Sequence, residues 1–205
     1  PLKLAAATSV LALGAASADT IKFAFIDPLS GPFGPSGEAA YTSYQLAAEH
    51  INENGGVNGD MIEIMGYDNK VNPKESLVQF QKAIDDGARY IVQGNGSSVA
   101  AALIEAVNKH NKRNPGDEVL FFNYAAVTPA FTNELCSFWH FRFDAHADMK
   151  MAAITDWIAE RDDIKSVYLI GQDYVFGQAV ASAAEGQLSE KRPDIEIVGN
   201  EFHPL

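Results

Sequence analysis

The stretch of the chain best suited to chemistry is a short apolar run that leads into glycines and serines. Tyr90–Gln93 is followed by Gly94-Asn95-Gly96-Ser97-Ser98, and apolar residues at helical spacing begin directly afterwards. Free backbone N–H groups and the positive end of a helix dipole favour an anion at such a position. Ser97 or Ser98 could instead do no more than cap the helix, which is a common role of serine at a helix start. The residues leave both interpretations open.

Patterns that are typical of enzymes are weak or missing. The glycine stretch does not fit G-x-G-x-x-G, no P-loop lysine follows it, and no G-x-S-x-G occurs. His140, His146 and Asp148 could be offered as metal ligands, but their spacing straddles a predicted strand and a predicted helix, so a solvated or capping role is favoured. No catalytic residue, metal or cofactor is predicted.

The charge balance excludes one class of partner. The chain has 205 residues, with 27 Asp and Glu against 15 Lys and Arg. No basic stripe could neutralise a phosphate backbone, so nucleic acid is a poor candidate.

Strand and helix patterns alternate along the chain, which predicts a parallel, doubly wound α/β sheet. Short apolar runs predict strands at residues 21–26, 61–65, 90–92, 118–122, 138–143, 165–170 and 195–198. Helical spacing predicts helices at residues 38–54, 73–86, 100–112, 144–161 and 178–191, and residues 27–37 read as a loop because they hold three prolines and three glycines. In such sheets the ligand lies at the carboxyl ends of the strands.

The first eighteen residues have the layout of a secretory signal peptide. A basic residue, Lys3, is followed by a small-residue apolar run that ends in Ala16-Ser17-Ala18, an A-x-A cleavage pattern. The run is too short to span a bilayer. We therefore expect cleavage after Ala18, export, and a product that is not embedded in a membrane.

Two further features bear on the organisation of the chain. Cys136 is the single cysteine, and its neighbours Leu135, Phe138 and Trp139 favour its burial. The α/β pattern breaks at about residues 138–144 and then begins again. We therefore expect a first lobe at residues 19–143 and the start of a second, truncated lobe at residues 144–205.

Several loose motifs, taken together, resemble one family. They are Asp27-Pro-Leu-Ser-Gly-Pro, the Asn-Glu-Asn-Gly-Gly-Val-Asn-Gly end of the first helix, the Gly96-Ser97-Ser98 turn, Tyr124-Ala-Ala-Val-Thr-Pro, and Asp173-Tyr-Val-Phe-Gly177. In order and spacing this set resembles the branched-chain amino acid binding proteins of ABC importers, which have the type I periplasmic-binding fold. The resemblance covers essentially everything after residue 18.

The resemblance also implies roles for residues of the first lobe. It implies that Gly96 and Ser97, with the Ser97 backbone N–H, hold the ligand carboxylate. Ala125 and Ala126 would present backbone groups to the charged end of the ligand. Val127 stands where the amino acid binders usually have a threonine.

Two more positions follow from the same resemblance. Ser36 lies near the place of an aromatic wall, and Phe176 stands where the second lobe commonly offers a tyrosine. Because Val127 and Phe176 provide no oxygen, the remainder of the ligand is predicted to be less polar, as in an aromatic or aliphatic acid, with branched-chain amino acids as the default.

The resemblance thus implies a periplasmic solute-binding protein that is not an enzyme. Its partners would be a small carboxylate-bearing ligand and the membrane subunits of an ABC importer. A ligand-sensing domain of the same fold in a receptor or regulator is one alternative, and an exported α/β hydrolase is another.

Overall fold

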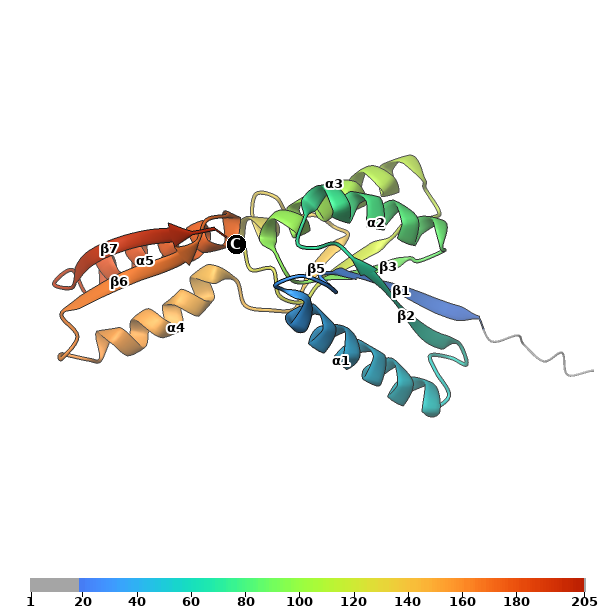
Figure 1. Ribbon diagram of the computed structural model, residues 1–205, viewed down its shortest axis with the longest axis horizontal. Helices are drawn as coiled ribbons and strands as arrows, with labels where there is room; N and C mark the ends of the chain where they lie inside the picture. Colours follow the sequence, from blue (N-terminus) through green and yellow to red (C-terminus); the bar gives the residue numbers. More distant parts are fainter. Residues whose placement is uncertain (1–18, 205) are drawn as a thin grey trace, which may run out of the picture.

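The computed structural model describes residues 19–204, in which strands and helices alternate as the sequence predicts (Figure 1). The predicted signal peptide, residues 1–18, lies outside the described residues, so cleavage after Ala18 stays a prediction. The elements are β1 (Thr20–Asp27), α1 (Gly34–Glu53), β2 (Met61–Asp68), α2 (Pro73–Asp85), β3 (Tyr90–Gln93), α3 (Ser97–Arg113), β4 (Leu120–Asn123), the 3-10 helix η1 (Pro129–Thr132), β5 (His140–Arg142), α4 (Ala147–Ala159), β6 (Ser166–Gln172), α5 (Val175–Lys191) and β7 (Glu196–His203).

The first five strands form one sheet in the order β2-β1-β3-β4-β5, with every pair parallel. Alternate residues of β1 point to opposite faces. Ala24 and Ile26 pack into the core under α2 and α3, whereas Phe25 packs against Tyr41 and Tyr44 of α1. Helices therefore lie on both faces of the sheet (Figure 1), and the predicted doubly wound α/β fold is confirmed.

The register of this sheet brings three strand ends together. Gln93 at the end of β3 pairs with Asn123 at the end of β4, and β1, which ends at Asp27, is the other neighbour of β3. The segments that follow β1, β3 and β4 therefore begin at one edge of the sheet, which is the edge where a ligand is expected.

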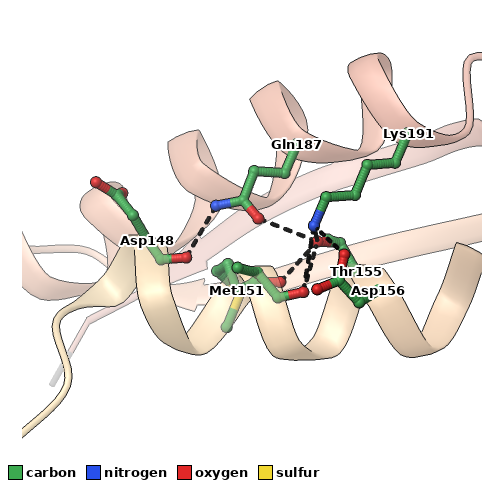
Figure 2. Close-up of polar contacts among 7 residues, drawn as sticks. Asp148, Met151, Thr155, Asp156, Gln187 and Lys191 are labelled. Atoms are coloured by element: carbon green, nitrogen blue, oxygen red, sulfur yellow. Dashed lines mark hydrogen bonds and ion pairs between the residues drawn. The ribbon is translucent and has the colours of Figure 1, made fainter.

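The second group of elements contains α4, α5 and the parallel pair β6 and β7. Polar side chains join α4 to α5 (Figure 2). The buried Thr155 hydroxyl accepts a hydrogen bond from Lys191 Nζ at 2.9 Å and lies 3.0 Å from Gln187 Oε1, while Gln187 Nε2 donates to the carbonyl of Asp148 at 2.9 Å. These contacts fix α4 beside α5. The lobe boundary predicted between residues 143 and 144 stays a prediction.

The structure corrects two expectations. Cys136 is exposed rather than buried, because Leu135 and Phe138 beside it also face outward. Helix α1 begins at Gly34, within the predicted loop, since Pro35 is suited to a first helical turn and Gly37 packs directly against the Pro28 carbonyl, where a Cβ would lie 1.7 Å from the oxygen.

None of the described helices has both the length and the apolar character that crossing a membrane requires.

Candidate functional site

The predicted site residues of the first lobe gather at the carboxyl edge of the five-stranded sheet. Gly96 and Ser97 join β3 to α3, and Ala125–Val127 follow β4. Ser36 lies in the first turn of α1, and its hydroxyl donates to Asn95 Oδ1 at 3.3 Å. Strand order therefore brings together residues that lie up to ninety-one positions apart in the chain, from 36 to 127.

The segment Gly94–Ser97, which we call the seat turn, presents the start of α3. Gly96 has φ +96°, a conformation that glycine adopts without strain, and it occupies the N-cap position with no side-chain cap. The capping interpretation of Ser97 is therefore wrong. The N–H groups of Val99 and Ala100 donate to the Gly96 carbonyl. Those of Ser97 and Ser98 make no backbone hydrogen bond within residues 19–204, so they remain available to an anion in front of α3.

Ser97 has a buried hydroxyl group that no group within residues 19–204 satisfies. Only 1% of the residue is exposed, and its Oγ has no hydrogen-bond partner within the part of the chain that the structure describes. A buried hydroxyl without a partner costs about 1–3 kcal/mol. A ligand oxygen bound here would remove that cost.

The loop after β4 is held by Asn123. The Oδ1 of Asn123 accepts from the N–H groups of Ala125 (3.2 Å) and Ala126 (2.7 Å), and its Nδ2 donates to the Ala126 carbonyl at 2.8 Å. The Val127 carbonyl accepts from the N–H of Ala147 at the start of α4. Several backbone groups of Ala125–Val127 are thus already hydrogen-bonded within the protein. Fewer of them are free to bind a ligand than the resemblance implies.

Two basic side chains support this loop from β5. Arg142 Nη1 donates to the Thr128 carbonyl at 3.0 Å, and His140 Nε2 lies 3.2 Å from Asn123 Nδ2. Burial, together with the nearby charge of Arg142, lowers the pKa of His140 to about 4. A neutral His140 can accept from the Asn123 amide, so its neutral form fits this arrangement.

Thr128 adds a second unsatisfied hydroxyl to the region. Its Oγ1 is buried and lacks a partner within residues 19–204. Val127, one position earlier, is buried and has no polar side-chain atom. An oxygen is thus present beside the position where the resemblance expects a threonine.

Phe176 lies in α5, on the other group of elements. It faces Tyr174 with ring centroids 5.9 Å apart and lines a pocket of about 410 Å³ formed by α4, α5, β6 and β7. Helices α5 and α3 are in contact, so the two groups of elements meet at α3. Phe176 is placed on a different group of elements from the other predicted site residues.

The sequence reasoning missed a polar network behind the seat turn. The carboxylate of Asp27, at the end of β1, accepts from Tyr124 Oη and from the N–H of Asn95. The sequence did contain a signal for this network. Asp27 is a carboxylate that directly follows a predicted apolar strand, and that strand ends at the same edge of the sheet as β3 and β4.

The capping role that the sequence favours for His146 is confirmed, because its side chain accepts from the N–H of Met149 at the start of α4. As a separate observation, no group of three or more His, Cys, Asp or Glu residues within residues 19–204 is arranged to hold a metal ion.

Comparison with known proteins identifies the family. Residues 20–205 match the family described as periplasmic binding protein. The chain is 36% identical over 203 residues to the Leu/Ile/Val-binding protein homolog 4 of Brucella abortus, covering 98% of this chain and 48% of the relative.

Solved structures agree with this match. The leucine-, isoleucine-, valine-, threonine- and alanine-binding protein of Brucella ovis, in a closed conformation, superposes with a TM-score of 0.77 at 35% identity, over 92% of this chain and 48% of that one. A solute-binding protein of an ABC transporter from Rhodopseudomonas palustris, in complex with 3,4-dihydroxybenzoic acid, has a TM-score of 0.76 at 24% identity, over 91% and 48%, and shares the fold.

The chain spans about half the length of the curated relatives that it matches first. The match over nearly the whole chain, the parallel sheet and the alignment to solved relatives all lead to the same assignment: this chain belongs to the periplasmic binding protein family.

Proposed function

We propose that this chain is part of a periplasmic, exported solute-binding protein that delivers a small carboxylate-bearing molecule to the membrane subunits of an ABC importer. The observation that carries the proposal is the buried Ser97 hydroxyl at the start of α3, which has no hydrogen-bond partner in the part of the chain that the structure describes. The ligand carboxylate accepts hydrogen bonds from this hydroxyl and from the first amides of the helix, where the helix dipole favours negative charge. No bond is made or broken in this function.

The default ligand is a branched-chain amino acid. The relatives with more than 30% identity carry Leu/Ile/Val-binding or leucine-, isoleucine-, valine-, threonine- and alanine-binding names. Binding would occur between two lobes that close about the crossing at residues 143–145, which lies between β5 and α4. Phe176 on α5 and the seat turn on the first lobe would then contact the same ligand.

A less polar acid, aliphatic or aromatic, is the second candidate. Val127 and Phe176 provide no oxygen for an ammonium group, and each hydrogen bond to a charged group is worth about 1.5–3 kcal/mol. Thr128 Oγ1 is the counterargument, because it is buried, unpartnered within residues 19–204 and only one position away.

Substitution of Ser97 tests the carboxylate seat. In the complete protein as expressed from its gene, we expect Ser97→Ala to weaken binding of L-leucine, measured by titration calorimetry, by about ten- to hundredfold, because a hydrogen bond to a charged group is lost. The ligand-free variant should lose no stability and should gain about 1–3 kcal/mol in unfolding free energy, because the substitution removes a buried hydroxyl that has no partner within residues 19–204.

Ser98→Ala is the matched control. Ser98 is the next residue of the same helical turn and is only partly buried, so its substitution should change the affinity little. A Ser97→Ala variant that binds leucine like the wild type but unfolds about 1 kcal/mol more easily would show that the hydroxyl stabilises the protein instead, and would overturn the seat.

A further inference from the structure

Asn95, in the middle of the seat turn, is held by side chains from four parts of the fold. Its N–H donates to Asp27 Oδ1 at 3.0 Å, and its Nδ2 donates to Asp27 Oδ2 at 2.9 Å and to Tyr124 Oη at 3.1 Å. Its carbonyl accepts from Gln93 Nε2 at 2.6 Å, and its Oδ1 accepts from Ser36 Oγ at 3.3 Å. Asn95 has all its polar groups engaged in this way, so the position of the turn depends on these partners.

Asp27 is a buried carboxylate whose partners are all neutral. It is 0% exposed, and its oxygens accept from Asn95 and from the Tyr124 hydroxyl. None of the ion pairs within residues 19–204 includes it. A carboxylate that is removed from water without a cation beside it favours its protonated form.

The titratable groups around Asp27 come from three other segments. Tyr44 approaches from α1, Tyr124 from the loop after β4, and Asp68 is the register partner of Asp27 on β2. Burial and the charge of Asp27 raise the pKa of both tyrosines, so both stay neutral near pH 6. Partial burial raises the pKa of Asp68, but hydrogen bonds led by that from Ser30 lower it overall, so Asp68 stays ionised there.

Asp27 differs from these neighbours. Burial raises its pKa to about 6, even though hydrogen bonds from Tyr124 and Asn95 act in the opposite direction. Of these four side chains, Asp27 is the one that changes its charge between pH 5 and pH 7.

Resting on the proposed function, we propose that Asp27, Asn95 and Tyr124 position the seat turn, and that a proton on Asp27 favours the binding of a carboxylate at Ser97. One residue, Asn95, connects the Asp27 carboxyl group to the turn that receives the ligand. A negative charge on Asp27 repels a carboxylate seated at the start of α3, and the burial of Asp27 and Ser97 limits the screening of that repulsion by water. Ligand binding therefore takes up a proton when the pH is above the pKa of Asp27.

The pH dependence of affinity tests this inference. L-Leucine keeps one charge state between pH 5 and pH 8, so its titration into the complete protein reports changes in the protein. We expect the affinity to fall by about three- to tenfold as the pH rises through 6, because a negative charge then forms on Asp27 near the ligand carboxylate. Asp27→Asn should remove this dependence, because an amide does not ionise.

Tyr124→Phe separates positioning from general packing. The Tyr124 ring stacks on Phe25 and keeps its place, while the hydroxyl that donates to Asp27 is lost. Because the charged form of Asp27 loses a donor, we expect the midpoint of the affinity profile to move to higher pH. Tyr44→Phe is the matched control, since Tyr44 lies 5.8 Å from the Tyr124 ring and its variant should keep the wild-type midpoint.

The possible outcomes are distinct. Leucine affinity that is flat or that rises between pH 5 and pH 8, or equal midpoints for the Tyr124→Phe and Tyr44→Phe variants, would overturn the inference and leave the proposed function standing. If neither leucine nor 4-methylpentanoate binds at any pH, the proposed function itself fails, and the inference with it.

Discussion

Ser97 is the residue at which two interpretations of the sequence separate. A serine at the start of a helix is ordinarily a cap, yet in this fold Gly96 takes the cap position and the Ser97 hydroxyl is buried with no partner within residues 19–204. Proteins rarely leave such a group unsatisfied without a functional reason. The hydroxyl is therefore better explained by a bound ligand than by the stability of α3.

His140 shows how one buried side chain supports the loop that follows β4. Its neutral ring accepts from Asn123, which in turn fixes Ala125 and Ala126. Protonation of His140 Nε2 would place one N–H donor against another, the Asn123 amide, and the hydrogen bond between them would be lost. Acid should therefore destabilise the loop after β4.

The stability of the complete protein should depend on pH through His140. Its pKa is about 4 in the folded state against 6.5 in the unfolded chain, so the unfolded state binds more protons in that window. The contribution of neutral His140 to the free energy of unfolding is present above pH 6.5 and is lost as the pH falls toward 4. We expect His140→Gln to flatten this fall in chemical-denaturation measurements made between pH 6.5 and pH 4.

Asp27 acts in the opposite direction and serves as the internal control. Its pKa is raised from 3.8 to about 6 in the folded protein. The contribution of protonated Asp27 to the free energy of unfolding is therefore present below pH 3.8 and is lost as the pH rises to about 6. Asp27→Asn should therefore steepen the fall in stability with acid, whereas His140→Gln flattens it. A His140→Gln variant with an unchanged pH profile would contradict the role given to the neutral ring.

At the scale of elements, the contact between α4 and α5 depends on polar groups that are well satisfied. Thr155 is 1% exposed, and its hydroxyl meets Lys191 and Gln187 of the facing helix (Figure 2). Unlike Ser97, it has partners on the protein. Its loss should therefore affect folding rather than binding.

Thr155→Val keeps the shape of the side chain and removes the hydroxyl. We expect a loss of about 1–3 kcal/mol in the unfolding free energy of the complete protein, because the Lys191 and Gln187 side chains lose a buried partner. Thr42→Val, on an exposed position of α1, is the matched control and should cost little. Equal effects of the two variants in urea denaturation would show that the helix contact does not depend on Thr155.

The elements themselves were largely predictable from the sequence. Periodicity located the strands and helices because buried stripes at spacings of 2 and 3.6 residues follow from packing on a parallel sheet. The start of α1 was missed, since the three prolines of residues 27–37 suggest a loop and the close contact of Gly37 with Pro28 is visible only in three dimensions.

The candidate site was predictable only in part. The seat turn has a local signature, but the Asp27–Asn95–Tyr124 network joins positions up to ninety-seven residues apart, and only the strand order brings them together. The exposure of Cys136 was missed for a related reason, because apolar neighbours in sequence need not be covered in space.

At the scale of the whole molecule, the described chain leaves large apolar side chains in contact with water. Phe138 is 80% exposed and Phe143 71%, and Ile170 on the two-stranded sheet is 75% exposed. Apolar surface of this kind typically marks a contact with another segment or partner. Because the chain spans about half of its relatives, binding measurements belong on the complete protein.

The central claim is that the carboxylate of the ligand is held at the start of α3, and titration of the complete protein with three related molecules tests it most directly. L-Leucine carries both charged groups, 4-methylpentanoate lacks the ammonium, and 3-methylbutan-1-amine lacks the carboxylate. We predict that at least one of the two carboxylates binds the wild-type protein and that Ser97→Ala lowers its affinity by about tenfold or more. The amine should not bind. Binding of the amine as tightly as leucine, or binding of none of the three, would contradict the account.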